Sequence, residues 1–171
     1  MEAPSAWVVR WADCVTRGPV LDLACGGGRH AHYFAERGLE VVAVDREPVS
    51  IPGVQQFVTA DLEDGSPWPL GERRFAAIVV ANYLHRPLFP VLEAALEEGG
   101  VLLYETFMAG NERYGRPSNP AFLLRPGELL EAFRNLSVVA FEQGRVERPK
   151  AAVVQRLFAV RGAAESVRIA P

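Results

Sequence analysis

Residues 20–31 read Val-Leu-Asp-Leu-Ala-Cys-Gly-Gly-Gly-Arg-His-Ala, an apolar run that contains one acid and is followed by three consecutive glycines. Glycines are costly inside a regular element, because each loses much backbone freedom on folding. They suit a sharp turn, or a place where a ligand contacts bare backbone. Open α/β sheets bind nucleotide-like ligands at a turn between a strand and a helix. The stretch therefore predicts the first strand, turn and helix of such a sheet, with a ligand site at the turn.

Outward from this turn, predicted strands and helices alternate along the chain. Hydrophobic periodicity predicts strands at 20–24, 39–44, 54–60, 75–80, 101–105, 136–143 and 152–160, and helices at 3–16, 28–37, 87–97 and 127–133. Only about eight residues separate the last two strands, too few for a helical crossover, so this pair is expected to be antiparallel. The other strands alternate with helices, which predicts a parallel sheet covered on both faces. The first helix is expected to pack against the edge or mouth of this sheet.

The size and composition of the chain limit its class. With 171 residues, 49% of them hydrophobic, residues 1–171 fit a single domain, with the N-terminal helix inside 1–18. The formal net charge of −3 argues against a dedicated nucleic-acid surface. No apolar run is long enough to span a membrane, and no secretory signal is visible. Two cysteines do not suggest a disulfide framework, so a cytoplasmic protein is expected. The basic residues late in the chain are interpreted as a solvated face: Arg145, Arg148, Lys150, Arg156 and Arg161.

Two cofactors compete for the glycine turn. Residues 26–31 fit the dinucleotide pattern G-x-G-x-x-G/A, and Asp45 follows Gly26 by 19 residues, close to the place of a ribose-binding acid. A nicotinamide dinucleotide, S-adenosylmethionine and a purely structural turn are all compatible with this pattern. Asp22 favours S-adenosylmethionine, because an acid beside the turn attracts an ammonium and a sulfonium but repels a pyrophosphate. Asp61, at the end of the third predicted strand, is placed to accept a hydrogen bond from an adenine amino group.

Five stretches together resemble the motifs of class I S-adenosylmethionine-dependent methyltransferases. They are residues 20–28, 41–45, 59–62, 75–83 and 96–103. The resemblance covers the chain from residue 20 to about residue 161 and, within the class, is similar to small bacterial enzymes of the tellurite-resistance group. It implies a Rossmann-like three-layer α/β sandwich, whose seven-stranded sheet is mostly parallel with an antiparallel last strand. It also implies S-adenosylmethionine as cofactor and S-adenosylhomocysteine as product.

The resemblance assigns a role to each matched residue. The glycine backbone would run beside the methionine part of the cofactor, and Asp22 would brace the loop and interact with the ammonium. Asp45 would accept from both ribose hydroxyls, and Arg46 would lie against the adenine. Each acid also has an alternative as an ordinary loop or turn residue. The implied cofactor-binding residues are Asp22, Ala24, Gly26, Gly27, Gly28, Asp45, Arg46, Asp61, Leu62 and Ala81.

Methyl transfer needs a positioned acceptor more than an enzyme nucleophile. The acceptor atom must lie about 3–3.5 Å from the methyl carbon, and a general base is needed only when the acceptor is O–H or N–H. The candidates near the acceptor are Tyr83, His85, Glu105 and Arg116. His85 is a candidate base because histidine has an ordinary pKa of ~6.5; alternatively, it caps or pairs around the start of the next helix with Arg86. Residues 106–126 are interpreted as a substrate-side loop, either a lid or a surface excursion.

The prediction is therefore a methyltransferase that acts on a small molecule. The alternatives are a non-catalytic S-adenosylmethionine-binding module or partner subunit and, third, an NAD(P)-linked oxidoreductase. No metal site is expected, because His30 and His32 do not share a helix face. Neither a membrane nor a nucleic acid is an expected partner, and the sequence does not indicate an oligomeric state or a particular acceptor.

Overall fold

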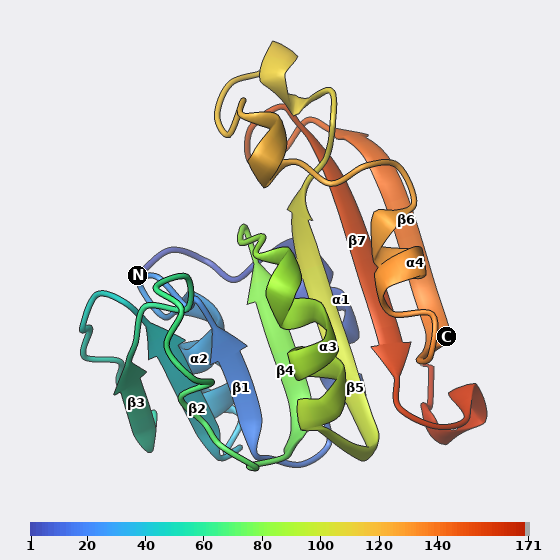
Figure 1. Cartoon of the computed structure of the whole chain (residues 1–171). Helices are drawn as coiled ribbons and strands as arrows, with labels where there is room; N and C mark the ends of the chain where they lie inside the picture. The colour runs from blue at the N-terminus through green and yellow to red at the C-terminus, as the bar shows by residue number, and fades with distance from the viewer. Residues whose placement is uncertain (170–171) are drawn as a thin grey trace.

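Seven strands form one sheet between two layers of helices in the computed structural model, which describes residues 1–169 (Figure 1). Across the sheet the strand order is β3-β2-β1-β4-β5-β7-β6. The strands are β1 (Val20–Leu23), β2 (Val41–Asp45), β3 (Gln56–Thr59), β4 (Phe75–Ala81), β5 (Leu96–Phe107), β6 (Ser137–Val146) and β7 (Ala152–Val160). The five strands from β3 to β5 pair in parallel, and β7 pairs antiparallel with both β5 and β6. The predicted fold class, including the antiparallel last strand, is confirmed.

The two faces of the sheet carry separate hydrophobic clusters. Helices α1 (Ala6–Trp11) and α2 (Arg29–Glu36) pack on one face, and α3 (Phe89–Ala95) and α4 (Glu128–Ala132) on the other. Successive strand residues point to opposite faces. In β1, for example, Leu21 belongs to the α3 and α4 side and Val20 to the α1 and α2 side. The central strands are therefore apolar throughout, as expected for parallel strands buried on both faces.

The N-terminal helix is shorter than expected and packs elsewhere. Helical structure covers only α1 and a 3-10 turn at Ala12–Cys14, within the predicted 3–16. The Ser5 side chain caps α1 by accepting from the Val8 N–H at 3.1 Å. The Trp11 ring lies 4.9 Å from the Phe158 ring of β7, so α1 covers the face of the sheet and not its edge or mouth. Two buried tryptophans need such a face to remove their large apolar surface from water.

The ends of three other elements also differ from the prediction. Helix α3 ends at Ala95, not at residue 97, because the chain enters β5 at Leu96 and bulges between its pairings with Phe75 and Ala77. A Cβ on Gly100 would lie 2.9 Å from the carbonyl oxygens of Phe75 and Glu97, so this close approach requires glycine. The strand β5 also continues to Phe107, and β6 continues to Val146.

Within residues 1–169, no helix has both the length and the apolar character needed to cross a bilayer. No group of three or more His, Cys, Asp or Glu residues in the same range is arranged to hold a metal ion.

Candidate functional site

The carboxyl ends of β1, β2 and β4 meet where the strand order reverses. Strand β1 lies between β2 and β4, and the chain continues from β1 into α2 on one face and from β4 into α3 on the other (Figure 1). Open α/β sheets form their ligand crevice at this switch point. The turn after β1 is held there by a hydrogen bond from the Cys25 N–H to the Val44 carbonyl, at 3.0 Å.

The three glycines of this turn have different structural roles. A Cβ added to Gly26 or Gly27 would meet no atom within 4 Å, so both present open backbone. A Cβ on Gly28 would lie 2.3 Å from Cδ1 of Ile51. Gly28 also has a φ of 77° and is the N-cap of α2. Glycine is therefore required at position 28 for packing and for backbone conformation. Gly28 does not line the cavities described below.

Asp22 is the acid inside β1, and it is almost fully buried. Its Oδ2 accepts from the Ala31 N–H at 2.8 Å, in the first turn of α2. Burial raises the pKa of Asp22 to about 7, although this hydrogen bond and nearby Arg29 lower it. Asp22 is thus a buried carboxyl group close to its titration point at neutral pH. The hydrogen bond ties the end of β1 to the first turn of α2.

The other two acids lie at the ends of neighbouring strands. Asp45 Oδ2 accepts from the Gly26 N–H at 2.8 Å, and its Oδ1 accepts from the Glu47 N–H at 3.1 Å. The acid that ends β2 therefore fixes the glycine turn after β1. Asp61 forms a local turn by accepting from the Glu63 N–H at 2.9 Å.

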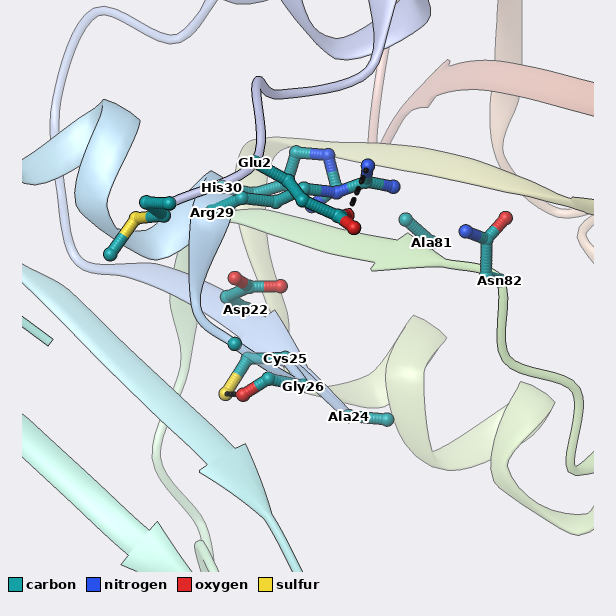
Figure 2. A pocket seen from close by; sticks show the side chains of 11 residues that line it. Glu2, Asp22, Ala24, Cys25, Gly26, Arg29, His30, Ala81 and Asn82 are labelled. Carbon is teal, nitrogen blue, oxygen red and sulfur yellow. Dashed lines mark hydrogen bonds and ion pairs between the residues drawn. The ribbon is translucent and has the colours of Figure 1, made fainter. Parts of the chain in front are cut away.

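Two cavities flank the glycine turn and share Ala24, Gly26 and Asn82. The Asp22 cavity has a volume of about 500 Å³ and is lined by Met1, Glu2, Asp22, Ala24, Cys25, Gly26, Gly27, Arg29, His30, Ala81 and Asn82. In Figure 2, Glu2, Arg29 and His30 lie on one side of this cavity, with Asp22 and Gly26 facing them. The Asp45 cavity has a volume of about 600 Å³ and is lined by Ala24, Gly26, Asp45, Arg46, Glu47, Pro48, Val49, Ala60, Asp61, Leu62, Glu63, Asn82, Tyr83 and Phe122.

Two residues at this junction have unusual backbone conformations. Ala24 has a φ of 51° and Asn82 a φ of 57°, and they are the non-glycine residues with positive φ in the described chain. Ala24 follows β1 and Asn82 follows β4, where the Asn82 N–H donates to the Glu105 carbonyl at 2.8 Å. Such strain persists where surrounding structure enforces it, and it gathers at binding sites. Here both strained residues line both cavities.

A third cavity opens beside the Asp22 cavity. This Glu105 cavity has a volume of about 740 Å³ and shares Glu2, Arg29 and Asn82 with the Asp22 cavity. Glu105, 6% exposed, forms an ion pair with Arg156 across the β5–β7 pairing. The remaining wall is formed by Ala3, Pro4, Ser5, Ala6, Phe107, Asn111, Tyr114, Arg116, Val146, Arg148, Pro149, Lys150, Ala151 and Ala152.

The four acceptor-side candidates do not come together. Glu105 and Arg116 line the Glu105 cavity. Tyr83 lines the Asp45 cavity, and its buried hydroxyl has no hydrogen-bond partner among residues 1–169. Burial and the nearby Glu63 carboxylate raise the pKa of Tyr83, so this phenol stays protonated at neutral pH. His85 lines a further cavity of about 690 Å³, which shares Ala60, Asp61, Leu62 and Glu63 with the Asp45 cavity and no residue with the Glu105 cavity. His85 has extended backbone and follows the buried Leu84, and neither residue lines the Glu105 cavity.

Arg86 has a structural role, but not at the start of the next helix as the alternative from the sequence had it. Its guanidinium pairs with Glu128 at 2.6 Å and donates to the carbonyls of Ala121 and Leu123 at 3.0 and 2.9 Å. Arg86 therefore anchors the end of the segment predicted as a substrate-side loop.

That segment begins after β5, at residue 108, and is packed against the body of the protein. Met108 and Leu124 form a β-bridge and are both buried. The buried Asn111 donates to the Pro117 carbonyl at 3.0 Å and accepts from the Val153 N–H at 3.0 Å. The segment is thus packed at its two ends and at Asn111, while residues 118–122 are exposed; Asn111, Tyr114 and Arg116 line the Glu105 cavity.

Several cavity residues were not among the sequence candidates. Asn82 lines all three cavities, and its position directly after β4 was the signal that could have identified it. Arg148, Lys150 and Arg156 were interpreted as part of a solvated face; Arg148 and Lys150 are exposed but also line the Glu105 cavity, and the interpretation was wrong for Arg156, whose side chain is mostly buried in ion pairs. Sequence distance concealed this, since the β6–β7 turn meets the 108–124 segment only in the folded protein. Arg145 and Arg161 lie outside the cavity, in ion pairs with Glu147 and Glu98.

The two histidines of α2 have structural contacts. His30 Nε2 accepts from the Ser5 N–H at 3.1 Å, and burial lowers the pKa of His30 to about 4. His30 is therefore neutral and ties the N-terminal segment to α2. His32 lies 3.3 Å from Glu36, one turn along the helix.

The chain was compared with known families and structures. Residues 20–103 match the family model described as a methyltransferase domain. No curated protein matches the chain in sequence. Among solved structures, TehB from Haemophilus influenzae superposes with a TM-score of 0.76 at 16% identity; the match covers 95% of this chain and 64% of TehB. This chain therefore spans less than two thirds of TehB.

Two further similar structures are complexes with S-adenosylhomocysteine. One is the 1,6-didemethyltoxoflavin-N1-methyltransferase of Burkholderia thailandensis with bound S-adenosylhomocysteine, with a TM-score of 0.63, 23% identity, and coverage of 92% of this chain and 77% of that one. The other is the glycopeptide N-methyltransferase MtfA complexed with S-adenosylhomocysteine, with a TM-score of 0.63, 19% identity, and coverage of 94% and 91%. At these identities the likeness establishes the shared fold.

The residues of the crevice fit S-adenosylmethionine. Open glycine backbone and a buried acid line one cavity, further acids line the next, and the two cavities are continuous through shared residues. The methyltransferase model covers the strands that build this crevice and decides against the dinucleotide alternative. Residues 20–103 thus match a methyltransferase domain, and the chain shares the fold of solved S-adenosylmethionine-dependent methyltransferases.

Proposed function

We propose that this enzyme methylates a small molecule held in the Glu105 cavity, using S-adenosylmethionine held across the Asp22 and Asp45 cavities. The observation that carries the proposal is the position of Asn82, which lines all three cavities at the carboxyl end of β4. A donor and an acceptor on either side of this residue would be neighbours. Small-molecule sites usually have volumes of roughly 300–1,000 Å³, and the Glu105 cavity, at about 740 Å³, lies in that range.

We assign a different part of the cofactor to each of the two cavities. In the Asp22 cavity, Asp22, Gly26, Gly27 and Ala81 would hold the methionine part, with the ionised Asp22 carboxylate balancing the ammonium. In the Asp45 cavity, Asp45 would accept from the ribose hydroxyls. Each carboxylate oxygen accepts more than one hydrogen bond, so the bond from Gly26 to Asp45 leaves room for a hydroxyl.

The adenine would lie at the far end of the Asp45 cavity, where Arg46, Asp61 and Leu62 form the wall. The protonated Tyr83 hydroxyl lies in the same wall beside the Glu63 carboxylate, so a hydrogen bond to adenine would compete with Glu63. Ala24 lines both cavities and would contact the middle of the cofactor. Gly28 supports this site only indirectly, through its packing on Ile51.

The chemistry requires positioning. When bound, S-adenosylmethionine supplies an activated methyl group, which the acceptor takes by in-line displacement. The chain has to orient the acceptor atom and exclude water. Glu105 is the acid on the acceptor side, and its pairing with Arg156 fixes the carboxylate in the cavity wall. Glu105 is therefore the residue placed to receive or orient an acceptor proton, and Arg116 is placed to hold the acceptor.

The test combines binding with turnover. Calorimetry with S-adenosylmethionine and S-adenosylhomocysteine measures donor binding, and release of S-adenosylhomocysteine over a panel of amines, phenols, thiols and carboxylic acids measures transfer. We expect Glu105→Gln to lower turnover and leave donor affinity unchanged. His85→Ala is expected to preserve turnover across pH 6–9, because His85 lines another cavity. Donor binding without transfer to any acceptor would favour a non-catalytic binding module instead.

The expected cytoplasmic location remains part of this proposal. Its support is that both cysteines in the described chain, Cys14 and Cys25, are free thiols. Fractionation of the native host would test it.

A further inference from the structure

The Glu105 cavity has an excess of positive charge, although the chain as a whole carries a formal net charge of −3. Five cationic side chains and two acidic ones line it: Arg29, Arg116, Arg148, Lys150, Arg156, Glu2 and Glu105. Glu105 is paired with Arg156, which also pairs with Glu142 outside the cavity. Glu2 is paired with Arg29 at 3.5 Å. Both acids that line the cavity are therefore already neutralised.

The other three cations, Arg116, Arg148 and Lys150, are left without a counter-charge. Among residues 1–169, none of the three has an acidic group within ion-pairing distance. Each is exposed to solvent at the cavity wall and is free to contact a ligand. An acidic protein that gathers unpaired cations at one cavity concentrates positive potential there and attracts anions to it.

The three cations come from two chain segments that fold against each other. Arg116 belongs to the 108–124 segment, and Arg148 and Lys150 belong to the β6–β7 turn. The segments meet closely, because a Cβ on Gly115 would lie 3.3 Å from Lys150 Nζ. Bringing like charges together costs free energy, and a bound anion would offset that cost.

The rest of the wall suits an organic body. Phe107, Tyr114, Val146 and Pro149 contribute apolar and aromatic surface to the same cavity. A ligand with an apolar portion and an anionic group would use both kinds of surface. Guanidinium and ammonium groups form charge-assisted hydrogen bonds with carboxylate and phosphate alike.

We propose that the acceptor is a small organic anion bearing a carboxylate or a phosphate group, which Arg116, Arg148 and Lys150 bind in the Glu105 cavity. This inference rests on the proposed function, because it names the substrate class of the same cavity. The anionic group lies at the cationic wall, and the methylated atom lies toward Asn82, which this cavity shares with the Asp22 cavity.

The experiment uses matched probes on the full chain saturated with S-adenosylhomocysteine. Benzoate and phenyl phosphate are the anionic probes, and benzamide and benzyl alcohol are their neutral counterparts. Binding of each is measured by calorimetry to the native chain and to the triple variant Arg116→Gln/Arg148→Gln/Lys150→Gln. The matched control is Arg113→Gln/Arg134→Gln/Arg168→Gln, which removes three exposed cations that do not line the cavity and lowers the net charge equally.

We expect the native chain to bind an anionic probe at least about tenfold more tightly than its neutral counterpart, and only the cavity variant to lose this preference. Whether benzoate or phenyl phosphate binds more tightly distinguishes a carboxylate from a phosphate acceptor. Equal losses in the cavity and control variants would mean general electrostatics and would overturn the inference. A single-stranded oligonucleotide that binds at the cavity more tightly than any small probe would also overturn it.

These outcomes separate the inference from the proposed function. If S-adenosylhomocysteine binds normally to both triple variants while the charged probes show no preference, the inference fails alone. If S-adenosylhomocysteine does not bind the native chain, the proposed function fails and the inference fails with it.

Discussion

The Asp22 carboxylate and the Ala31 N–H are joined by a 2.8 Å hydrogen bond that ties the end of β1 to the first turn of α2. Because burial raises the pKa of Asp22 to about 7, the folded protein keeps a proton that an unfolded chain loses near pH 4. The contribution of Asp22 to stability is therefore full at low pH and is lost as the pH rises from about 4 to about 7. The affinity for the cofactor should change with pH in the opposite direction and rise with pH, because an ammonium group binds the ionised carboxylate more strongly than the protonated one.

The first prediction is that affinity for S-adenosylhomocysteine, which carries this ammonium, rises with pH through about 7 in the native chain. Asp22→Asn should abolish the rise, because the amide oxygen still accepts from Ala31 but carries no charge. At pH 8 the variant should lose on the order of 1.5–3 kcal/mol of binding free energy. Calorimetry from pH 6 to 8 measures this, with thermal denaturation as the check on folding. Identical pH profiles in the two proteins would remove Asp22 from ammonium binding.

The second prediction concerns Asp45 and the ribose. Asp45→Ala is a poor test, because it also removes the acceptors for the Gly26 and Glu47 N–H groups. Asp45→Asn keeps an oxygen for one of these two N–H groups and turns an NH2 group toward the other, and we expect it to weaken cofactor binding about 10- to 100-fold by losing charged hydrogen bonds. Asp64→Asn is the matched control, since Asp64 also accepts from the N–H two residues on but does not line the Asp45 cavity. If both variants bind S-adenosylhomocysteine equally well, the ribose assignment is wrong.

The central sheet and the donor crevice could be predicted from the sequence because their signals are local. The strand of residues 20–23, the glycines after it and the acid at residue 45 are each read from a few neighbouring residues. Parallel strands then bring their carboxyl ends together as a consequence of the fold. The positions of Asp22, Gly26, Asp45 and Asp61 around one crevice follow from this regularity.

The acceptor side could not be predicted in the same way because it depends on tertiary contacts. Arg116 and Lys150 are far apart in the sequence, and only the packing of the 108–124 segment on the β6–β7 turn places them at one cavity. The sequence predicts His85 near the acceptor together with Glu105, because both residues lie at or just after the ends of neighbouring predicted strands. In the folded protein His85 lines a cavity that shares no residue with the Glu105 cavity, and the positive φ of Asn82 in the same connection has no sequence signal as strong as glycine.

The third prediction separates two adjacent glycines. Gly27→Ala should leave the fold intact, because its Cβ would meet no atom within 4 Å. It should nevertheless weaken cofactor binding, because the methyl group would enter the Asp22 cavity. Gly28→Ala should destabilise the protein by about 1–3 kcal/mol through overpacking, because its Cβ would collide with Ile51, and a φ of 77° adds strain.

Chemical denaturation and calorimetry on both glycine variants measure these effects. Gly28→Ala/Ile51→Ala relieves the collision but keeps the strain, so it should show less than the sum of the two single losses. If Gly27→Ala is the variant that unfolds the protein, the different structural roles given to these glycines are wrong.

The last prediction concerns the anchor of the 108–124 segment. Glu128 is buried, with a side chain 5% exposed, and Arg86 is its partner at 2.6 Å. Burial alone would raise the pKa of Glu128, but hydrogen bonds from Arg86 and the Arg125 N–H outweigh it and lower the pKa. The stability from this carboxylate is therefore present above its unfolded pKa and is lost as the pH falls through its folded pKa.

Arg86→Ala should cost about 1–3 kcal/mol of unfolding free energy at pH 7, because the buried Glu128 then keeps only the more distant Arg125 guanidinium, at 3.7 Å, as a charged partner. This loss of unfolding free energy is smaller than the loss expected when a fully buried ion pair is broken, because the Arg86 side chain is 38% exposed and water screens its charge. Arg86→Ala/Glu128→Gln should recover part of the loss, because the double variant has no unpaired charge. Urea denaturation at pH 7 and pH 4 measures both effects, and the cost of Arg86→Ala should shrink at the lower pH. An equal cost at both pH values, with no recovery in the double variant, would show that Arg86 acts only through its bonds to the Ala121 and Leu123 carbonyls.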